Sequence, residues 1–387
     1  MFKLSRPLLA CLSATLILST VSMVKAQHDP AWTASGIISG GTSPAAKAPS
    51  RRTTTKTAPR KKASVVQNTP TAENYYEEGE ALYQAAKYRE ALEKYLKAAE
   101  IDPSMASALY RIGWIYNDLE QYSSAIDPLK RAITLQPNNA AAQFELGYSY
   151  KKVERYAEAM ATFQQTVRIK PDYAGAYYEI GWLHNEQKNY DEAVKSLRTA
   201  LTYRSNYAEA HNELGYALRN LGRYQEAIQE YQQAISQKSN LGLAYLGLGD
   251  VYFYNTKQYA EATAAYRQGL QLRPGNATAQ YNLGWCYNDL ERYHEAVEAL
   301  GKAVQIQPNY PEAHNELGFA LHQLTRYAEA VQHYQIAIQQ KTNYASAHYN
   351  LGMAYLAMQN RNGALEEYRI LQRIDTARAT KLFNQIK

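Results

Sequence analysis

The chain has 387 residues, of which 46% are hydrophobic and 20% are charged. A mean hydropathy of −0.53 excludes a protein with many membrane spans, and a total of two cysteines excludes a disulfide-held scaffold. The formal net charge of +6 would favour nucleic-acid binding only if the positive charges lay in a folded part. Tyrosine is unusually common, with 35 copies against 6 Phe and 4 Trp.

Residues 1–26 are predicted to form a secretory signal peptide. Lys3 and Arg6 supply a positive start, an apolar stretch follows from Leu8 to Val24, and Ala26 ends a short-residue cleavage site. We expect an exported protein, periplasmic or secreted, and an uncleaved N-terminal membrane anchor is the less favoured alternative. Cleavage would leave Cys286 as the only cysteine, so no disulfide is expected.

Residues 27–71 are predicted to be a disordered basic linker, because they are rich in Pro, Ala and Thr and have no apolar periodicity. Asp29 is their only acidic residue. The basic ones are Lys47, Arg51, Arg52, Lys56, Arg60, Lys61 and Lys62. The total of +6 therefore comprises +3 from residues 1–26, +6 from the linker and −3 from residues 72–387. No nucleic-acid partner is expected, and the linker either contacts an anionic envelope surface or is a solvated spacer.

From residue 72 onward the sequence repeats every 34 residues. The marks are prolines at Pro103, Pro137, Pro171, Pro274 and Pro308, separated by 34, 34, 103 and 34 residues. The interval of 103 equals three units and one inserted residue, which falls within Asp250–Asn255, where we expect a lengthened turn. A period of this size indicates stacked pairs of helices.

The unit at residues 140–173 shows why each repeat should be two helices. Leu146, Gly147 and Tyr150 share one face of a first helix, and Ala159 and Phe163 share one face of a second. The small residues let two helix backbones approach closely while the large ones fill the space between them. A proline near the end of the unit stops the second helix.

The spacing L-G-x-x-Y, then A-x-x-x-F, then P resembles the tetratricopeptide repeat family. The resemblance implies an all-α solenoid of nine helix-turn-helix units that form a right-handed superhelix. The units are 72–105, 106–139, 140–173, 174–207, 208–241, 242–276, 277–310, 311–344 and 345–378, and residues 379–387 are expected to be a C-terminal capping helix. Every unit has Gly at its eighth position and Ala at its twentieth, but the family's Trp at the fourth position is missing from all nine. Units 4–6 and 7–9 also resemble each other, since Ala210–Gly215 recurs as Ala313–Gly318.

In the family, positions 5, 9 and 12 of the first helix line a concave groove that binds peptides or partner helices. Aromatic rings and Asn occupy these positions, and both suit an extended chain because rings bury apolar side chains and amides pair with a backbone. The alternative is that the rings pack against the next repeat. The candidate groove residues are Tyr110, Trp114, Asn117, Tyr148, Tyr178, Trp182, Asn185, Asn212, Tyr216, Tyr281, Trp285, Asn288, Asn315 and Phe319.

No catalytic motif is present, and no metal or cofactor is expected. His211, His314 and His348 occupy the same position in different units, which should separate them in space rather than gather them around a metal. We therefore expect a non-enzymatic scaffold or adaptor that binds a protein or peptide partner. The alternative is a cell-envelope glycan or peptidoglycan-associated binding protein. The sequence indicates neither the partner's identity nor the oligomeric state.

Overall fold

The computed structural model of the chain describes residues 70–387. The predicted signal peptide and residues 27–69 of the predicted linker lie outside this part. Within residues 70–387 there is no strand, and no helix has the length and apolar character that a membrane span requires. The described part is therefore built from helices and the turns that join them.

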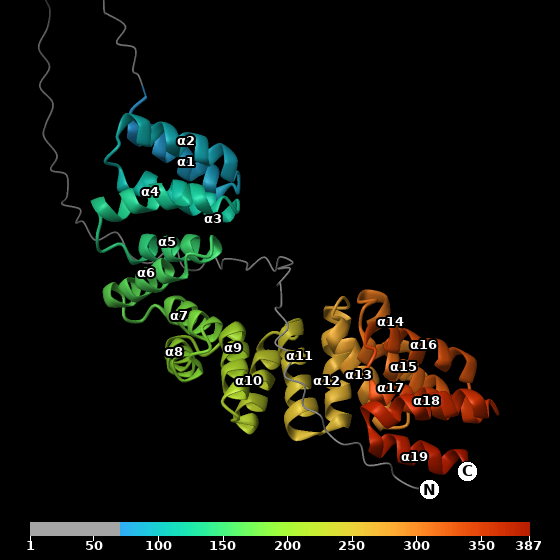
Figure 1. Ribbon diagram of the computed structural model, residues 1–387. Helices are drawn as coiled ribbons and strands as arrows, with labels where there is room; N and C mark the ends of the chain where they lie inside the picture. The colour runs from blue at the N-terminus through green and yellow to red at the C-terminus, as the bar shows by residue number, and fades with distance from the viewer. Residues whose placement is uncertain (1–69) are drawn as a thin grey trace, which may run out of the picture. The chain divides into compact units, whose positions relative to one another are not determined.

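The helices come in nine pairs and are followed by one more helix (Figure 1). The first helices are α1 Ala72–Gln84, α3 Ala106–Asp118, α5 Ala140–Lys152, α7 Ala174–Glu186, α9 Ala208–Asn220, α11 Gly242–Asp250, α13 Ala277–Asp289, α15 Pro311–Gln323 and α17 Ala345–Ala357. The second helices are α2 Tyr88–Ile101, α4 Tyr122–Leu135, α6 Tyr156–Ile169, α8 Tyr190–Tyr203, α10 Tyr224–Gln237, α12 Tyr259–Leu272, α14 Tyr293–Ile306, α16 Tyr327–Gln340 and α18 Arg361–Ile374, and the last helix is α19 Thr376–Ile386. The predicted all-α solenoid is confirmed.

A tight turn with one left-handed residue joins the two helices of every pair. After α3, the N–H of Glu120 donates to the Asn117 carbonyl at 3.0 Å and the N–H of Gln121 donates to the Tyr116 carbonyl at 2.8 Å. These two bonds form a Schellman motif, which requires a left-handed residue after the helix. Glu120 adopts that conformation with φ of 61°, and the matching residue of every other pair also has positive φ.

Close approach of the two helices in a pair depends on the glycine at unit position 8. A Cβ atom added to Gly147 would lie 2.7 Å from the ring of Phe163, which is fully buried on the second helix. Ala159, one turn earlier on the same helix, is also fully buried. The pattern of small and large residues therefore fixes the distance between the two helices, as the sequence predicts.

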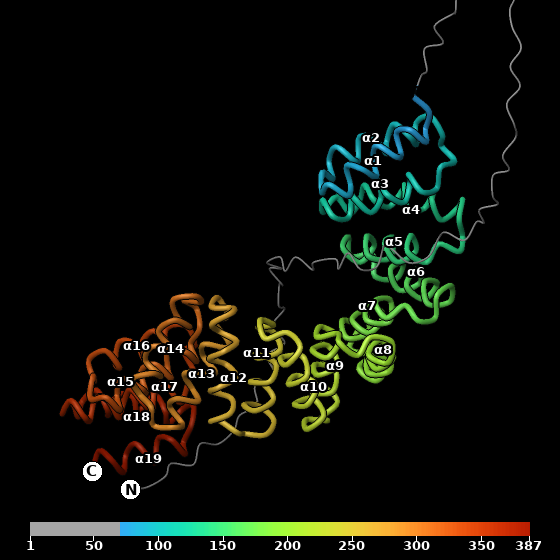
Figure 2. The backbone as a smooth tube through the Cα atoms, turned by 180° about the vertical axis from the view of Figure 1, so that it is seen from behind, coloured from blue at the N-terminus to red at the C-terminus, as the bar shows by residue number. Residues whose placement is uncertain are grey.

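The pairs stack in chain order, from α1 at one end to α19 at the other, in both views (Figures 1 and 2). First helices of neighbouring units contact one another. These contacts join α3 to α5, α7 to α9, α9 to α11, α13 to α15 and α15 to α17. Successive second helices have no comparable contact within residues 70–387. The first helices are therefore the more closely spaced, and their free surface, which we call the inner face, lies on the inside of the curve.

The inserted residue of unit 6 does not lengthen a turn, so that expectation is wrong. Residues Val251–Thr256 form a π-helical segment, η2, that continues α11. Lys257 then takes the left-handed conformation, with φ of 57°, and Tyr259 begins the second helix as in the other units. The wider helical turn absorbs the extra residue. The left-handed residue of the connecting turn is kept, and the closing hydrogen bond runs from the Gln258 N–H to the Tyr252 carbonyl, six residues back instead of five.

The last helix covers the open end of unit 9. Its Leu382 and Ile386 are buried and pack with Leu371 of α18. It begins at Thr376, three residues before the start expected from the sequence, because the Asp375 side chain accepts a hydrogen bond from the Arg378 N–H and caps it. This helix shields from solvent a core surface that another repeat would otherwise cover.

Candidate functional site

The inner face carries the predicted groove residues, and the structure first shows what their amides do. Asn117 donates from Nδ2 to the main-chain oxygen of Glu145 at 3.0 Å and to its carboxylate at 2.9 Å. Asn185 makes the same two bonds to Glu213, at 3.1 and 3.0 Å. In each case the partner lies 28 residues later, on the first helix of the next unit.

Asn288 repeats the arrangement with Glu316, at 3.1 Å for both bonds. All three asparagines are buried. Asn212 and Asn315 are buried as well, and Asn315 accepts a hydrogen bond from Asn350 of the next unit at 3.0 Å. Asn117, Asn185, Asn288 and Asn315 therefore hold neighbouring repeats together, whereas Asn212 bonds Glu213 of its own helix. The expectation that the amides of these four residues present free groups to the backbone of a partner needs correction. The reason is that position 12 of one unit faces position 6 of the next.

The carboxylates at position 6 are site residues that the candidate groove set omits. Glu145 is buried, and burial raises its pKa to about 7, although the hydrogen bond from Asn117 lowers it. Burial also raises the pKa of Glu213. Glu179 has a charged partner instead, since Lys151 of the preceding unit lies 2.5 Å away. The available signal was a Glu that recurs at position 6, 28 residues after an Asn or Lys at position 12 of the preceding unit.

The aromatic residues at position 9 pack against the tyrosine at position 17 of the preceding unit. Trp182 lies 6.1 Å from Tyr156 between ring centroids, at an interplanar angle of 63°. Five other pairs share this register: Trp114 with Tyr88, Tyr148 with Tyr122, Tyr216 with Tyr190, Trp285 with Tyr259 and Phe319 with Tyr293. We call these six pairs the ring ladder. Most have edge-to-face geometry, which is favourable for aromatic pairs.

The rings of the ladder are only partly covered by these contacts. Trp114, Trp182 and Trp285 are half-buried, and Tyr216 is exposed at 37%. Packing against the preceding repeat and exposure on the inner face therefore occur together, so the two alternatives drawn from the sequence are not exclusive. A ring held on one side by a tyrosine offers its remaining surface in a fixed orientation.

A second set of rings follows position 5. Tyr178 lies 4.9 Å from Tyr207, and Tyr281 lies 5.0 Å from Tyr310, between ring centroids. Tyr110 is half-buried too, and burial raises its pKa. These tyrosines explain much of the tyrosine excess, because the partner ring comes from the last position of the same unit.

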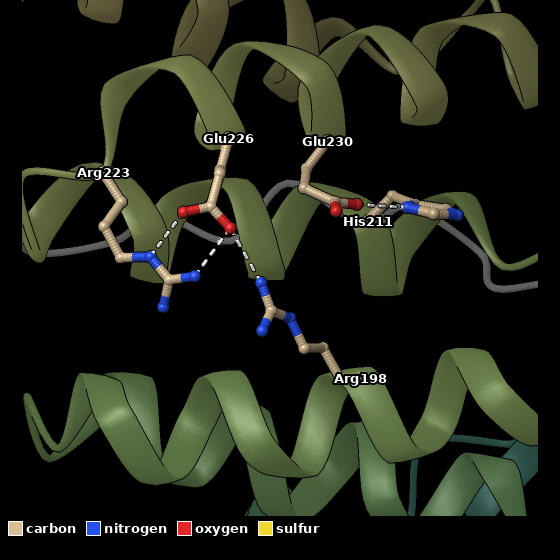
Figure 3. A network of polar contacts seen from close by, with 5 residues as sticks. All are labelled: Arg198, His211, Arg223, Glu226 and Glu230. Carbon is tan, nitrogen blue, oxygen red and sulfur yellow. Dashed lines mark hydrogen bonds and ion pairs between the residues drawn. The ribbon is translucent and has the colours of Figure 1, made fainter.

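Away from the ring ladder, polar contacts also join the helices (Figure 3). The guanidinium group of Arg223 donates two hydrogen bonds to Glu226, at 2.7 and 2.6 Å, and Arg198 of α8 donates to the same carboxylate at 2.9 Å. His211 Nδ1 lies 2.6 Å from the carboxylate of Glu230 on the second helix of its unit. The position that holds Trp in the family thus serves here as a polar bridge between paired helices.

The other two histidines at this position also contact the second helix of their unit, one through a Glu and the other through a second His. His348 Nδ1 lies 2.6 Å from Glu367. Burial alone would lower the pKa of His348. The hydrogen bonds to Glu367 and to the Thr342 carbonyl outweigh this effect, so the pKa is raised. His314 instead faces His333 at 3.1 Å, and burial followed by the charge of His314 lowers the pKa of His333 to about 4. Within residues 70–387 no three His, Cys, Asp or Glu side chains gather as metal ligands.

The repeat geometry can now be compared with known proteins. Models of the tetratricopeptide repeat match residues 76–140, 144–202, 178–241, 243–276, 286–325, 320–359 and 345–377. The chain belongs to the tetratricopeptide repeat family. No curated protein sequence matches it.

Solved tetratricopeptide structures resemble the chain at low identity. The C-terminal part of a repeat protein from Cytophaga hutchinsonii is 17% identical, with a TM-score of 0.50 over 62% of this chain and 99% of that one. YrrB, described as having an unusual peptide-binding site, is 25% identical, with a TM-score of 0.42 over 48% of this chain and 95% of that one. MamA from Desulfovibrio magneticus is 26% identical, with a TM-score of 0.40 over 44% of this chain and 96% of that one.

Proposed function

We propose that this tetratricopeptide repeat chain is a non-enzymatic scaffold that holds an extended segment of a protein partner along its inner face. The observation that carries the proposal is the ring ladder. Trp114, Trp182 and Trp285 occupy the same unit position, each is held by a tyrosine of the preceding repeat, and each keeps part of its surface open. Their regular spacing favours a ligand that extends across several repeats.

Fixed rings suit this task for an energetic reason. Trp and Tyr provide a large contact area with few rotatable bonds, and a ring already packed on one side loses little further freedom when a ligand covers the other. Lys151 lies 4.7 Å from the Trp182 ring centroid and makes an ion pair with Glu179, so charged groups border the rings. Such a border would select a partner by charge as well as by shape.

Cross-linking in the native cell followed by mass spectrometry would identify the partner, and its affinity can then be measured for Trp182→Ala and Trp285→Ala. We expect each variant to weaken binding by about tenfold or more, as for a central aromatic anchor. Leu197→Ala is the matched control, because Leu197 is fully buried away from the inner face and should lower stability without changing affinity. Unchanged affinity in both Trp variants would refute the assignment.

We also propose that the chain is exported, on the basis of the apolar stretch from Leu8 to Val24 and the basic residues before it. Amino-terminal sequencing of the protein recovered from its native cell tests this. We expect a mature chain that begins near Gln27. Recovery of the chain with Met1 intact from the cytosolic fraction would contradict the proposal.

A further inference from the structure

The ring ladder is interrupted between units 5 and 6. Tyr224 stands at position 17 of unit 5, the position from which Tyr190 of unit 4 and Tyr259 of unit 6 contact a ring of the following unit. The residue that should face it, at position 9 of unit 6, is Asp250. Within residues 70–387, Tyr224 has no ring contact in this register.

Asp250 is held by two neighbours instead of a ring. Its Oδ2 lies 2.8 Å from Nη1 of Arg219, and its Oδ1 accepts a hydrogen bond from the hydroxyl of Tyr266 at 2.7 Å. The Arg219 guanidinium also lies 5.5 Å from the ring centroid of Tyr216. The carboxylate is therefore fixed in place, at the unit position where the units before and after it carry Tyr216 and Trp285.

Tyr224 and Asp250 border a pocket on the surface. It has a volume of about 390 Å³ and is lined by Arg219, Asn220, Tyr224, Asp250, Tyr254 and Asn255. The volume is at the small end of ligand-binding pockets, which corresponds to a side chain rather than a whole cofactor. Phe253 cannot fill it, because its ring packs on the other side, 5.2 Å from Trp285 and 5.9 Å from Tyr259.

The π-helical segment η2 shapes one wall of the same pocket. The extra residue of unit 6 lies within this segment, which carries both Tyr254 and Asn255. Tyr254 is 54% exposed, yet its hydroxyl donates a hydrogen bond to Asn282 of the next unit at 3.0 Å, which orients the ring. Single π-helical turns within α-helices are frequent at functional sites. The missing ring and the inserted residue thus occur at one place.

We propose that this pocket receives an aromatic side chain, Trp or Tyr, from the bound partner segment, which supplies the ring missing from the ladder. The inference rests on the proposed binding function of the inner face. An incoming ring would meet Tyr224 as Trp182 meets Tyr156, and the carboxylate of Asp250 and the amides of Asn220 and Asn255 would accept an indole N–H or a phenol O–H. Trp and Tyr are therefore favoured over Phe, and all three over Leu.

The test uses the full chain with ring-labelled tyrosine and two probes, N-acetyltryptophanamide and N-acetylleucinamide, followed by NMR. Tyr224→Phe and Tyr254→Phe assign the two resonances. We expect the tryptophan probe to shift both signals saturably, and the leucine probe to bind about tenfold more weakly or not at all. Equal responses to the two probes, or tryptophan-induced shifts that avoid both tyrosines, would overturn the inference.

Variants separate the pocket from general surface binding. Asp250→Phe supplies a ring from the chain itself and should abolish binding of the tryptophan probe. Tyr254→Ala removes an exposed wall, so it should fold normally and also lose binding, which keeps the test valid if Asp250→Phe is unstable. Tyr203→Ala, which removes a tyrosine that is 48% exposed and lies outside the ring ladder, is the matched control and should retain binding. Undiminished binding in Tyr254→Ala would refute the pocket.

The outcome can be separated from that of the proposed function. If the probe fails to bind while Trp182→Ala and Trp285→Ala still weaken the partner, the inner face binds a partner and only the pocket assignment falls. If the probe binds but neither Trp variant affects the partner, the pocket exists and the proposed function is wrong.

Discussion

At the scale of single residues, two kinds of carboxylate lie at the joint between neighbouring repeats. Glu179 is neutralised by Lys151. Glu145 occupies the same position one unit earlier and has only the neutral amide of Asn117, so burial raises its pKa to about 7. A buried carboxylate without a positive partner is costly in its ionised form. The energy of this joint therefore depends on pH.

The first prediction concerns this pH dependence. Folded Glu145 keeps its proton up to about pH 7, whereas the unfolded chain releases it near the ordinary value of 4.5. The contribution of Glu145 to the free energy of unfolding is thus greatest below pH 4.5. It falls by roughly 3 kcal/mol as the pH rises to 7 and stays at that lower value above pH 7. Glu145→Gln should remove part of that fall, and Glu145→Gln with Glu213→Gln should remove more. Urea denaturation at several pH values measures the free energy of unfolding of each variant.

Glu158→Gln is the control for this experiment. The Glu158 side chain is 46% exposed, and the hydrogen bond from Arg155 lowers its pKa, so this group does not share the upward shift of Glu145. The variant should show the same fall as the parent chain. A fall of equal size in Glu145→Gln would mean that the carboxylate of Glu145 is hydrated in the folded state.

The sequence allowed the positions of these residues to be predicted, but not their partners. Trp182 and Asn185 stand out because they recur at fixed unit positions. That Asn185 faces Glu213, and that Trp182 faces Tyr156, depends on how far each repeat is rotated from the last. This rotation arises from packing over the whole solenoid, so periodicity alone does not reveal it.

At the scale of elements, glycine has two different roles in the helices. Gly147 lies against Phe163, where an added Cβ would be 2.7 Å from the ring. Gly301 lies within α14, and nothing lies within 4 Å of its added Cβ. The first position needs the absence of a side chain, and the second does not. The repeat already marks Gly147, because every unit has Gly at that position, and the structure adds that the site of Gly301 has room for a methyl group.

The second prediction follows from this difference. Gly147→Ala should destabilise the protein by about 1–3 kcal/mol because it overpacks the contact between α5 and α6. Gly301→Ala should stabilise it by up to about 1 kcal/mol because alanine is the better helix former. Differential scanning calorimetry of the two variants decides the matter. A gain in stability for Gly147→Ala would show that Phe163 can move away at little cost.

The start of each helix pair could also be read from the sequence, because Ala or a small residue opens the first helix and Tyr usually opens the second. The sequence located the inserted residue of unit 6 correctly within Asp250–Asn255, but the prediction that it lengthens a turn was wrong. The turn keeps its left-handed residue, Lys257, and differs from the other eight turns in that its closing hydrogen bond, from the Gln258 N–H to the Tyr252 carbonyl, spans one residue more. The π-helical segment Val251–Thr256 accepts the inserted residue by widening a single helical turn.

At the scale of the whole molecule, contacts run between neighbouring repeats, so stability is a sum of local terms rather than a property of one core. The third prediction uses α19. Leu382→Ala should cost about 2–5 kcal/mol, since Leu382 is fully buried. The loss should appear as faster hydrogen exchange in α17 and α18 and leave α1 to α4 unchanged. Lys381→Ala, on the exposed side of the same helix, is the control. Uniform loss along the chain would contradict local coupling.

The ring ladder has a consequence for how such a chain can change length. No complete ring pair lies within a single unit, because Tyr156 belongs to one repeat and Trp182 to the next. Units 2, 3, 4 and 7 thus carry one half of a pair for each of their two neighbours. Units 4–6 and units 7–9 each form a block of three. The first unit of each block contacts the preceding repeat through the same kind of ring pair, Trp182 with Tyr156 and Trp285 with Tyr259. Copying units 4–6 at this boundary therefore adds length without a mismatched seam, because the block ends with the unit of Tyr259 and begins with the unit of Trp182, whereas a copy of units 7–9 would place Arg361 at the seam.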